Sequence, residues 1–225
     1  MAKKINQGVI LRTLDWKYNK AISGFPGIDS SYEMAENYLK NQPDKIKAAN
    51  TLIRWQNTKS GTSGFIAGLG GIITSPVTIP VNLASIMFIQ IRMIAAIAII
   101  GGYDLKDHRF KSLIYACMTG NVAKEIIKDV GLIAGRKFAI SGIKQISSKS
   151  ITAINQKVGF RLLTKFGEKG VINLGKAVQI IGEVIGGSID SYTTNVIGNI
   201  ARNTFVGKHV KYYPYITISG YKITC

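Results

Sequence analysis

The chain has 225 residues, of which 46% are hydrophobic, so it can bury the core of one domain. Lysine and arginine total 29 against 12 aspartates and glutamates, and the formal net charge of +17 favours anionic partners such as phospholipid headgroups, nucleic acid or an acidic protein. Cys117 and Cys225 lie far apart without histidines at ligand spacing, which excludes a disulfide framework and a structural zinc site. We expect no metal and no cofactor.

The N-terminus does not have the pattern of a secretory signal. Two early lysines are present, but Arg12, Asp15 and Lys17 interrupt any apolar run that could follow them. We therefore expect a cytoplasmic protein that is peripheral to, or partly inserted at, the inner face of the membrane.

Three amphipathic helices are predicted in the first 60 residues. Over 5–22, apolar residues recur at helical spacing and Lys17 falls on the polar side in this interpretation; the apolar set is Leu11, Leu14, Tyr18, Ala21 and Ile22. The turn "GFPGIDSS" ends this helix, and Ser30 or Ser31 can cap a second helix that runs to about Lys40. After "NQPD", a third helix is predicted over about 44–59.

The next segment, "GTSGFIAGLGGIITSPVTIPVNLASIMFIQIRM", has no charged side chain from Gly61 to Ile91. Its length is sufficient to cross a bilayer, but Pro76 and Pro80 predict a break, and hence a helical hairpin over 61–101 whose second arm spans about 81–100. In that arm, the polar side chains of Asn82, Ser85 and Arg92 share one side, which we expect to face other helices. Three interpretations remain: a membrane-associated or conditionally inserted hairpin, a buried hairpin of a soluble bundle, and a single bitopic span, which the prolines disfavour.

Helical patterns continue to about residue 205. We predict helices over 110–130, 132–146, 150–166, 170–185 and 188–205, and a short hairpin around Ser219 and Gly220 in "YYPYITISGYKITC". The predicted fold is all-α: one multi-helix bundle over 1–208 with a central glycine-rich apolar hairpin, and an irregular or β tail over 209–225. Glycines at four-residue spacing are expected to pack helices closely: Gly64 and Gly68, Gly131 and Gly135, Gly182 and Gly186.

A basic stretch follows the apolar one, with no acidic residue from 136 to 165. We predict that it binds an anionic surface through Arg136, Lys137, Lys144, Lys149, Lys157, Arg161, Lys165 and Lys169. A solvated helix face is the alternative interpretation of this charge. Nucleic acid is disfavoured as the anion because no nucleic-acid-binding module is recognisable.

Arg92 is the only charged residue between 61 and 102 and should be buried. Because an unpaired buried guanidinium is costly, we expect a carboxylate beside it, with Asp190 as the first choice before Asp129 and Asp104.

Catalytic motifs are incomplete. "GVINLGKA" has the spacing of a phosphate-binding loop, but Ala177 stands where a magnesium-binding Ser or Thr is required. Ser188 with Asp190 leaves a lipid hydrolase as a further alternative, and His108 is the histidine available to it within the predicted bundle.

Three stretches carry a resemblance to a known family: "RWQNTKSGTSGFIAGLGGIITSPVTIPVNLASIMFIQIRMIAAIAIIGGYDL", "GFRLLTKFGEKGVINLGKAVQIIGEVIGGSID" and "TTNVIGNIARNTF". Together they resemble the EcsC family of bacterial proteins over about residues 14–206. The resemblance implies a possible partnership with a membrane complex, because the family's namesake accompanies an ABC transporter in its operon. It brings no established catalytic residues.

From these features we predict a non-enzymatic protein that docks on an anionic phospholipid membrane, where it assists a complex such as an ABC transporter or perturbs the bilayer. The alternative from a different class is a soluble helical module with an apolar pocket, lined from 61–101, that binds an acyl chain or another small apolar ligand. The sequence does not define the oligomeric state.

Overall fold

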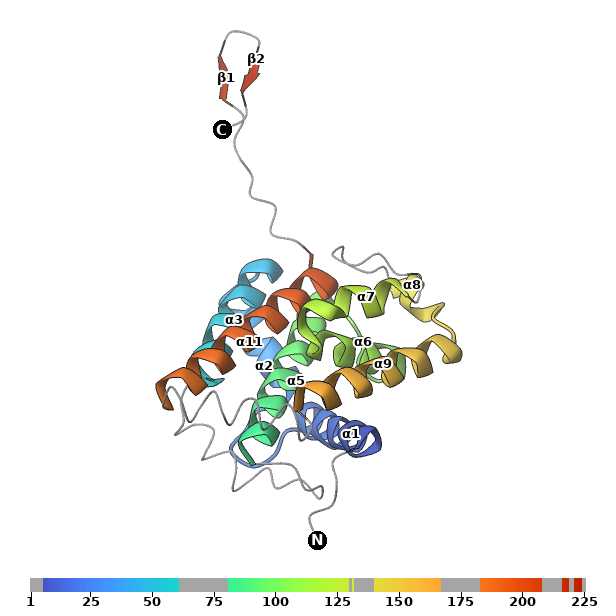
Figure 1. The fold of residues 1–225 in the computed structure, drawn as a ribbon. Helices are drawn as coiled ribbons and strands as arrows, with labels where there is room; N and C mark the ends of the chain where they lie inside the picture. The colour runs from blue at the N-terminus through green and yellow to red at the C-terminus, as the bar shows by residue number, and fades with distance from the viewer. Residues whose placement is uncertain are drawn as a thin grey trace.

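The computed structural model describes residues 6–60, 81–129, 131, 140–166, 183–207, 216–218 and 221–223. Over this part of the chain the protein is a bundle of helices, as predicted (Figure 1). The helices are α1 (Gln7–Ser23), α2 (Ser31–Asn41), α3 (Lys45–Ser60), α5 (Val81–Gly101), α6 (His108–Met118), η1 (Gly120–Val122), α7 (Ala123–Lys128), α8 (Ile140–Lys144), α9 (Ser148–Phe166) and α11 (Glu183–Phe205). In the tail, β1 (Ile216–Ile218) pairs antiparallel with β2 (Tyr221–Ile223).

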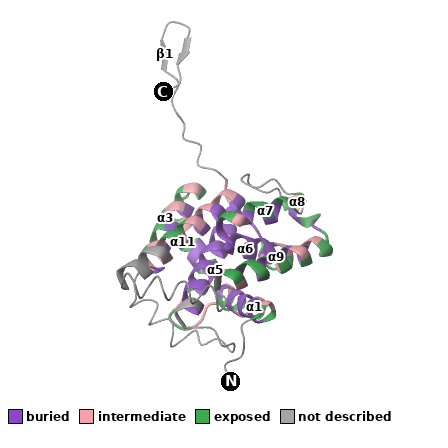
Figure 2. Ribbon diagram, viewed as in Figure 1, coloured by how far each residue is buried: buried purple, intermediate pink, exposed green. Residues whose placement is uncertain are grey.

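Helix α5 lies at the centre of the bundle and corresponds to the second arm of the predicted apolar hairpin; the first arm, 61–80, falls outside the described residues. It packs against α1, α2, α3, α6 and α11, and buried residues concentrate around it and α6 (Figure 2). By length and composition, Ala84–Gly101 is the one stretch among the described helices that could cross a membrane, and 94% of it is buried inside the fold. Ser85 and Arg92 are buried among neighbouring helices, as predicted for the polar side of this arm.

The connection between α1 and α2 follows from local chemistry. Gly24 and Gly27 have φ values of 68° and 82°, which glycine adopts without strain. Ser30 then caps α2: its Oγ accepts a hydrogen bond from the Glu33 amide at 3.1 Å, and the Glu33 carboxylate accepts one from the Ser30 amide at 2.7 Å. The predicted cap at this position is confirmed.

The single helix predicted over 110–130 is wrong. Helix α6 ends at Met118, and Gly120 adopts a φ of 68°, which a right-handed helix does not contain. A 3-10 turn and the short α7 follow, so the chain changes direction where the apolar pattern alone suggested continuity.

The predicted packing role of Gly131 is also wrong. Its φ of 80° and its amide hydrogen bond to the Lys128 carbonyl belong to the end of α7, and a Cβ there would meet no atom within 4 Å. Close packing occurs instead at Gly198, where a Cβ would lie 2.8 Å from Ile53, and at Gly101, where it would collide with the Phe205 carbonyl. Gly64, Gly68, Gly135 and Gly182 lie outside the described residues, and the surroundings of Gly186 are not described.

Substituting Gly101 should therefore destabilise the protein. In Gly101→Ala the methyl group would overlap backbone atoms of Phe205, which cannot rotate away as a side chain can. We expect a loss of about 1–3 kcal/mol in the free energy of unfolding, measured by urea denaturation.

Gly142→Ala is the matched control, because Gly142 is helical and a Cβ there meets nothing within 4 Å. This variant should be as stable as the parent or gain about 0.5–1 kcal/mol. Equal stability of the two variants would contradict close packing at Gly101.

Candidate anion-binding surface

Helix α9, which is amphipathic, carries most of the described part of the predicted basic region. Its inner side is buried through Ile151, Ile154, Val158 and Leu162, while Lys149, Lys157 and Arg161 are exposed. This alternation follows the helical period of the sequence, and α9 contains no acidic residue.

An aromatic side chain lies among these cations. Phe160 is 61% exposed, although a phenylalanine on an amphipathic helix is usually turned toward the core. We call Lys149, Lys157, Phe160 and Arg161 the outer face of α9. The sequence analysis missed Phe160. A signal was present, because Phe160 follows the polar residues Thr152 and Gln156 at eight and four residues and therefore shares their outward side of the helix.

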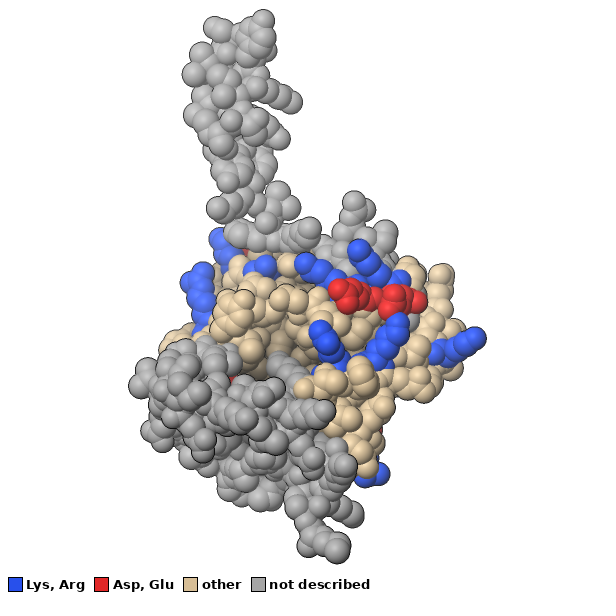
Figure 3. Space-filling model, in the orientation of Figure 1, with Lys and Arg blue, Asp and Glu red and all other residues tan. Residues whose placement is uncertain are grey.

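One cation of the outer face is partly neutralised. Lys157 forms an ion pair with Asp129, and both side chains are about half exposed. The absence of acids between 136 and 165 therefore does not leave every cation uncompensated, because α7 packs on α9 and places an acid from outside that range beside it. Figure 3 shows the same pattern on one side of the molecule, where a small acidic group is surrounded by cationic side chains.

The structure describes the remaining predicted anion-binding residues only in part. Lys144 is exposed on α8. Arg136, Lys137 and Lys169 lie outside the described residues, and for Lys165 the structure describes the helical backbone but not the side chain.

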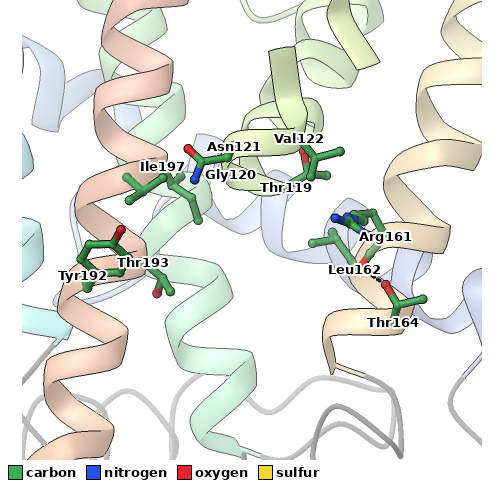
Figure 4. Close-up of a pocket in the computed structure, with 11 residues that line it drawn as sticks. Thr119, Gly120, Asn121, Val122, Arg161, Leu162, Thr164, Tyr192, Thr193 and Ile197 are labelled. Atoms are coloured by element: carbon green, nitrogen blue, oxygen red, sulfur yellow. Dashed lines mark hydrogen bonds between the residues drawn. The ribbon is translucent and has the colours of Figure 1, made fainter. Parts of the chain in front are cut away.

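A cavity of about 550 Å³ opens between α9, α11 and the turn after α6 (Figure 4). In Figure 4 the Arg161 guanidinium is directed toward the space between the helices. The lining residues are Thr119, Gly120, Asn121 and Val122 from the turn, Arg161, Leu162 and Thr164 from α9, and Tyr192, Thr193, Val196 and Ile197 from α11.

A second cavity, of about 540 Å³, is a shallow depression beside α2. Its described lining is Tyr32, Glu36, Leu39, Lys40 and Ile99. Ile99 is the only α5 residue among the described lining of these two cavities, and residues 61–80 lie outside the description, so the apolar pocket expected from 61–101 stays a prediction.

Arg92 is buried as predicted, with 7% of its surface exposed, but its partner is not Asp190. Its Nη1 donates a hydrogen bond to the Asp29 backbone carbonyl at 3.2 Å, and the guanidinium lies 5.8 Å from the Phe88 ring. No carboxylate among the described residues lies within 4 Å of it, and Asp129 pairs with Lys157 instead. Burial lowers the pKa of Arg92, and the charge of the nearby Asp29 opposes that change.

Lys17 is a second buried cation, and its predicted place on the polar side of α1 is wrong. Its side chain is fully buried, and the ammonium lies 4.5 Å from the Trp16 ring centroid. Burial lowers the pKa of Lys17 to about 8. The signal was present in the sequence, because residue 17 follows the buried Ile10 and Leu14 at seven and three residues.

The catalytic candidates are not assembled into a described site. His108 begins α6, and its side chain is 65% exposed. Asp190 is half-buried on α11, while the side chain of Ser188 on the same helix falls outside the description.

Comparison with protein-family models gives a match to the EcsC protein family over residues 5–206. The chain belongs to the EcsC family. Searches of curated proteins and of solved structures gave no match. The matched region includes every described helix, from α1 to α11. Strands β1 and β2 lie outside it.

For this EcsC-family chain, the surroundings of Arg92 predict unequal effects of two substitutions. Arg92→Ala removes the packing against Phe88 and leaves the Asp29 carbonyl without its donor, which we expect to cost about 2–4 kcal/mol of unfolding free energy. Arg92→Met keeps an unbranched side chain and removes a buried charge, so its loss should be at most half as large. Thermal and urea unfolding measure both, and equal losses would show that the charge itself is required.

The buried Lys17 predicts a pH dependence. The pKa of about 8 in the folded protein lies below the ordinary 10.5, so between these values the unfolded chain binds more protons at this site. Stability contributed by Lys17 therefore rises with pH through this range. Relative to Lys17→Met, the parent should gain stability from pH 7 to pH 10 in urea unfolding, and a constant difference would contradict the lowered pKa.

Proposed function

We propose that the protein is a non-enzymatic peripheral membrane protein that binds an anionic phospholipid surface through the outer face of α9. The observation that carries this proposal is the exposure of Phe160, at 61%, within a helix that has exposed cations and no acid. Exposed cations alone are compatible with a solvated helix face. An exposed aromatic side chain among them is costly in water and favourable at a membrane interface.

The two kinds of side chain would make different contributions. Lys149 and Arg161 would remain at the level of the headgroups, where each cation near an anionic leaflet gains about 1 kcal/mol. Lys157 would contribute less, because Asp129 already compensates its charge. Phe160 would enter the interface, and burying a phenylalanine side chain fully is worth about 1.5–3 kcal/mol.

The burial of α5 supports attachment at the surface over insertion of this helix. Its apolar side chains already pack against five helices, so exposing them to lipid would remove the core of the bundle. Attachment through α9 requires no such rearrangement, because the inner side of α9 stays packed against α1 and α6. From this position the protein would assist a membrane complex such as a transporter, the role that the family resemblance implies.

Liposome flotation tests the proposal. With vesicles of phosphatidylcholine and phosphatidylglycerol, the triple variant Lys149→Gln/Lys157→Gln/Arg161→Gln should bind about 2 kcal/mol less tightly, a factor of about 30, with a weaker dependence on salt. Phe160→Ser should lose about 1–2 kcal/mol without a change in salt dependence, because its contribution is apolar. Both variants replace exposed side chains, so their melting temperatures should stay close to that of the parent.

A triple variant of α3 tests the competing surface, because α3 also has exposed cations, no acidic residue and an exposed aromatic side chain, Trp55. Lys45→Gln/Lys47→Gln/Arg54→Gln removes three exposed cations and lowers the net charge equally, while α3 lies across the bundle from α9 (Figure 1). It should lose much less binding than the α9 variant. If the α3 variant loses as much binding as the α9 variant, or more, the outer face of α9 is not the specific membrane-binding surface. If the parent remains in the soluble fraction with anionic vesicles at low salt, the membrane proposal is wrong and the soluble alternative gains support.

A further inference from the structure

The cavity beside α9 joins the proposed membrane surface through one residue, Arg161. This arginine belongs to the outer face of α9 and also lines the 550 Å³ cavity, where its guanidinium is directed into the space between the helices (Figure 4). The other cations of the outer face, Lys149 and Lys157, do not line it. Arg161 can therefore contact a ligand at the protein surface or inside the cavity.

The charge of the described lining is entirely positive. Arg161 is the one charged side chain among the described lining residues, and none of them is acidic. No described residue forms an ion pair with its guanidinium, in contrast to Lys157, which is paired with Asp129. A guanidinium can donate two parallel hydrogen bonds to a phosphate or carboxylate. Because the described lining has no acidic side chain, the donors of Arg161 are available to an anionic ligand.

The neutral lining separates into polar and apolar parts. Three threonine hydroxyls donate to backbone carbonyls: Thr119 to Ala116, Thr164 to Arg161 and Thr193 to Asp190. These bonds occupy their protons, so the Asn121 amide and the Tyr192 hydroxyl are the neutral side-chain donors that remain at the cavity. Among the described lining residues, Val122, Leu162, Val196 and Ile197 present apolar surface.

We propose that this cavity binds the phosphate of a glycerophospholipid headgroup, with Arg161 as the principal ligand and Asn121 as a second donor. The proposal rests on the membrane function above and deepens it, because the outer face of α9 would bring the cavity to the headgroups. The apolar part of the lining would contact the glycerol and the first methylene groups of the lipid. A volume of 550 Å³ is within the ordinary range of small-molecule sites.

The test compares two anionic lipids that differ in headgroup chemistry. Flotation is measured with phosphatidylcholine vesicles carrying either phosphatidylglycerol or oleate, adjusted to equal zeta potential. A surface that responds only to charge binds both equally. The oleate carboxylate is attached directly to its acyl chain, so it has no glycerol phosphate that can extend into the cavity to both Arg161 and Asn121, and one additional hydrogen bond to a charged group is worth roughly a factor of ten. We expect the parent to prefer phosphatidylglycerol by about tenfold.

Three variants locate that preference. Arg161→Lys keeps the charge but loses the planar pair of donors, and Asn121→Trp fills the cavity from an exposed position; both should bind the two vesicle types equally. Lys149→Gln removes a cation from the same face outside the cavity, so it should weaken binding to both vesicle types and keep the preference. Melting temperatures of the variants verify that the fold is retained.

The outcomes separate this inference from the proposed function. Equal binding of the parent to both vesicle types, or a preference that survives Arg161→Lys and Asn121→Trp, overturns the headgroup site and leaves surface binding intact. Absence of binding to either vesicle type overturns both proposals.

A soluble phosphate compound is the other source of the same chemistry. Glycerol 3-phosphate is therefore added to the parent and to Arg161→Lys in a thermal-shift assay. Stabilisation of the parent alone, without a vesicle preference, assigns the site to a free phosphate ester and overturns the lipid assignment. A vesicle preference with little stabilisation by glycerol 3-phosphate supports the lipid.

Discussion

The removal of α5 from water is the constraint on which the rest of the structure depends. Over Ala84–Gly101 nearly every side chain is apolar, so this helix has no side that can face solvent without cost. Five helices pack around it, and several of its largest side chains, including Met87, Phe88 and Ile94, are almost completely buried. Its polar groups are only partly satisfied within the bundle: Gln90 Nε2 donates a hydrogen bond to Thr194 Oγ1 at 3.1 Å, whereas Gln90 Oε1 and Arg92 Nε have no hydrogen-bond partner among the described residues.

Because α5 provides the core, the outer sides of the surrounding helices are not needed for stability and can form binding surfaces. Helix α9 packs against α1 and α6 through its apolar side and also contacts α7. Its outward cations and Phe160 therefore contribute little to stability, and the same holds for the exposed Arg54 and Trp55 on α3. In such an arrangement, binding surfaces can change while the packing around α5 stays the same.

The features that sequence reasoning predicted well are those determined within a few residues of the chain. The Ser30 cap, the turn at Gly24 and Gly27, and the amphipathic period of α9 are local, and the structure has them where the pattern indicates. The partner of Arg92 and the close approach at Gly101 and Gly198 depend on which distant helices meet, and periodicity carries no information on that. The cavity at Arg161 belongs to the same class, because its lining comes from three separate parts of the chain.

The packing of α11 on α5 also has a consequence for synthesis. The ribosome completes α5 long before it begins α11, the helix that covers one of its sides in the finished bundle. At about 5–20 residues per second, an apolar helix with the composition of a membrane span remains incompletely covered for several seconds in every nascent chain. Chaperones and the membrane-insertion machinery both recognise such segments, so the time at which α11 emerges limits how long the new chain is exposed to either of them.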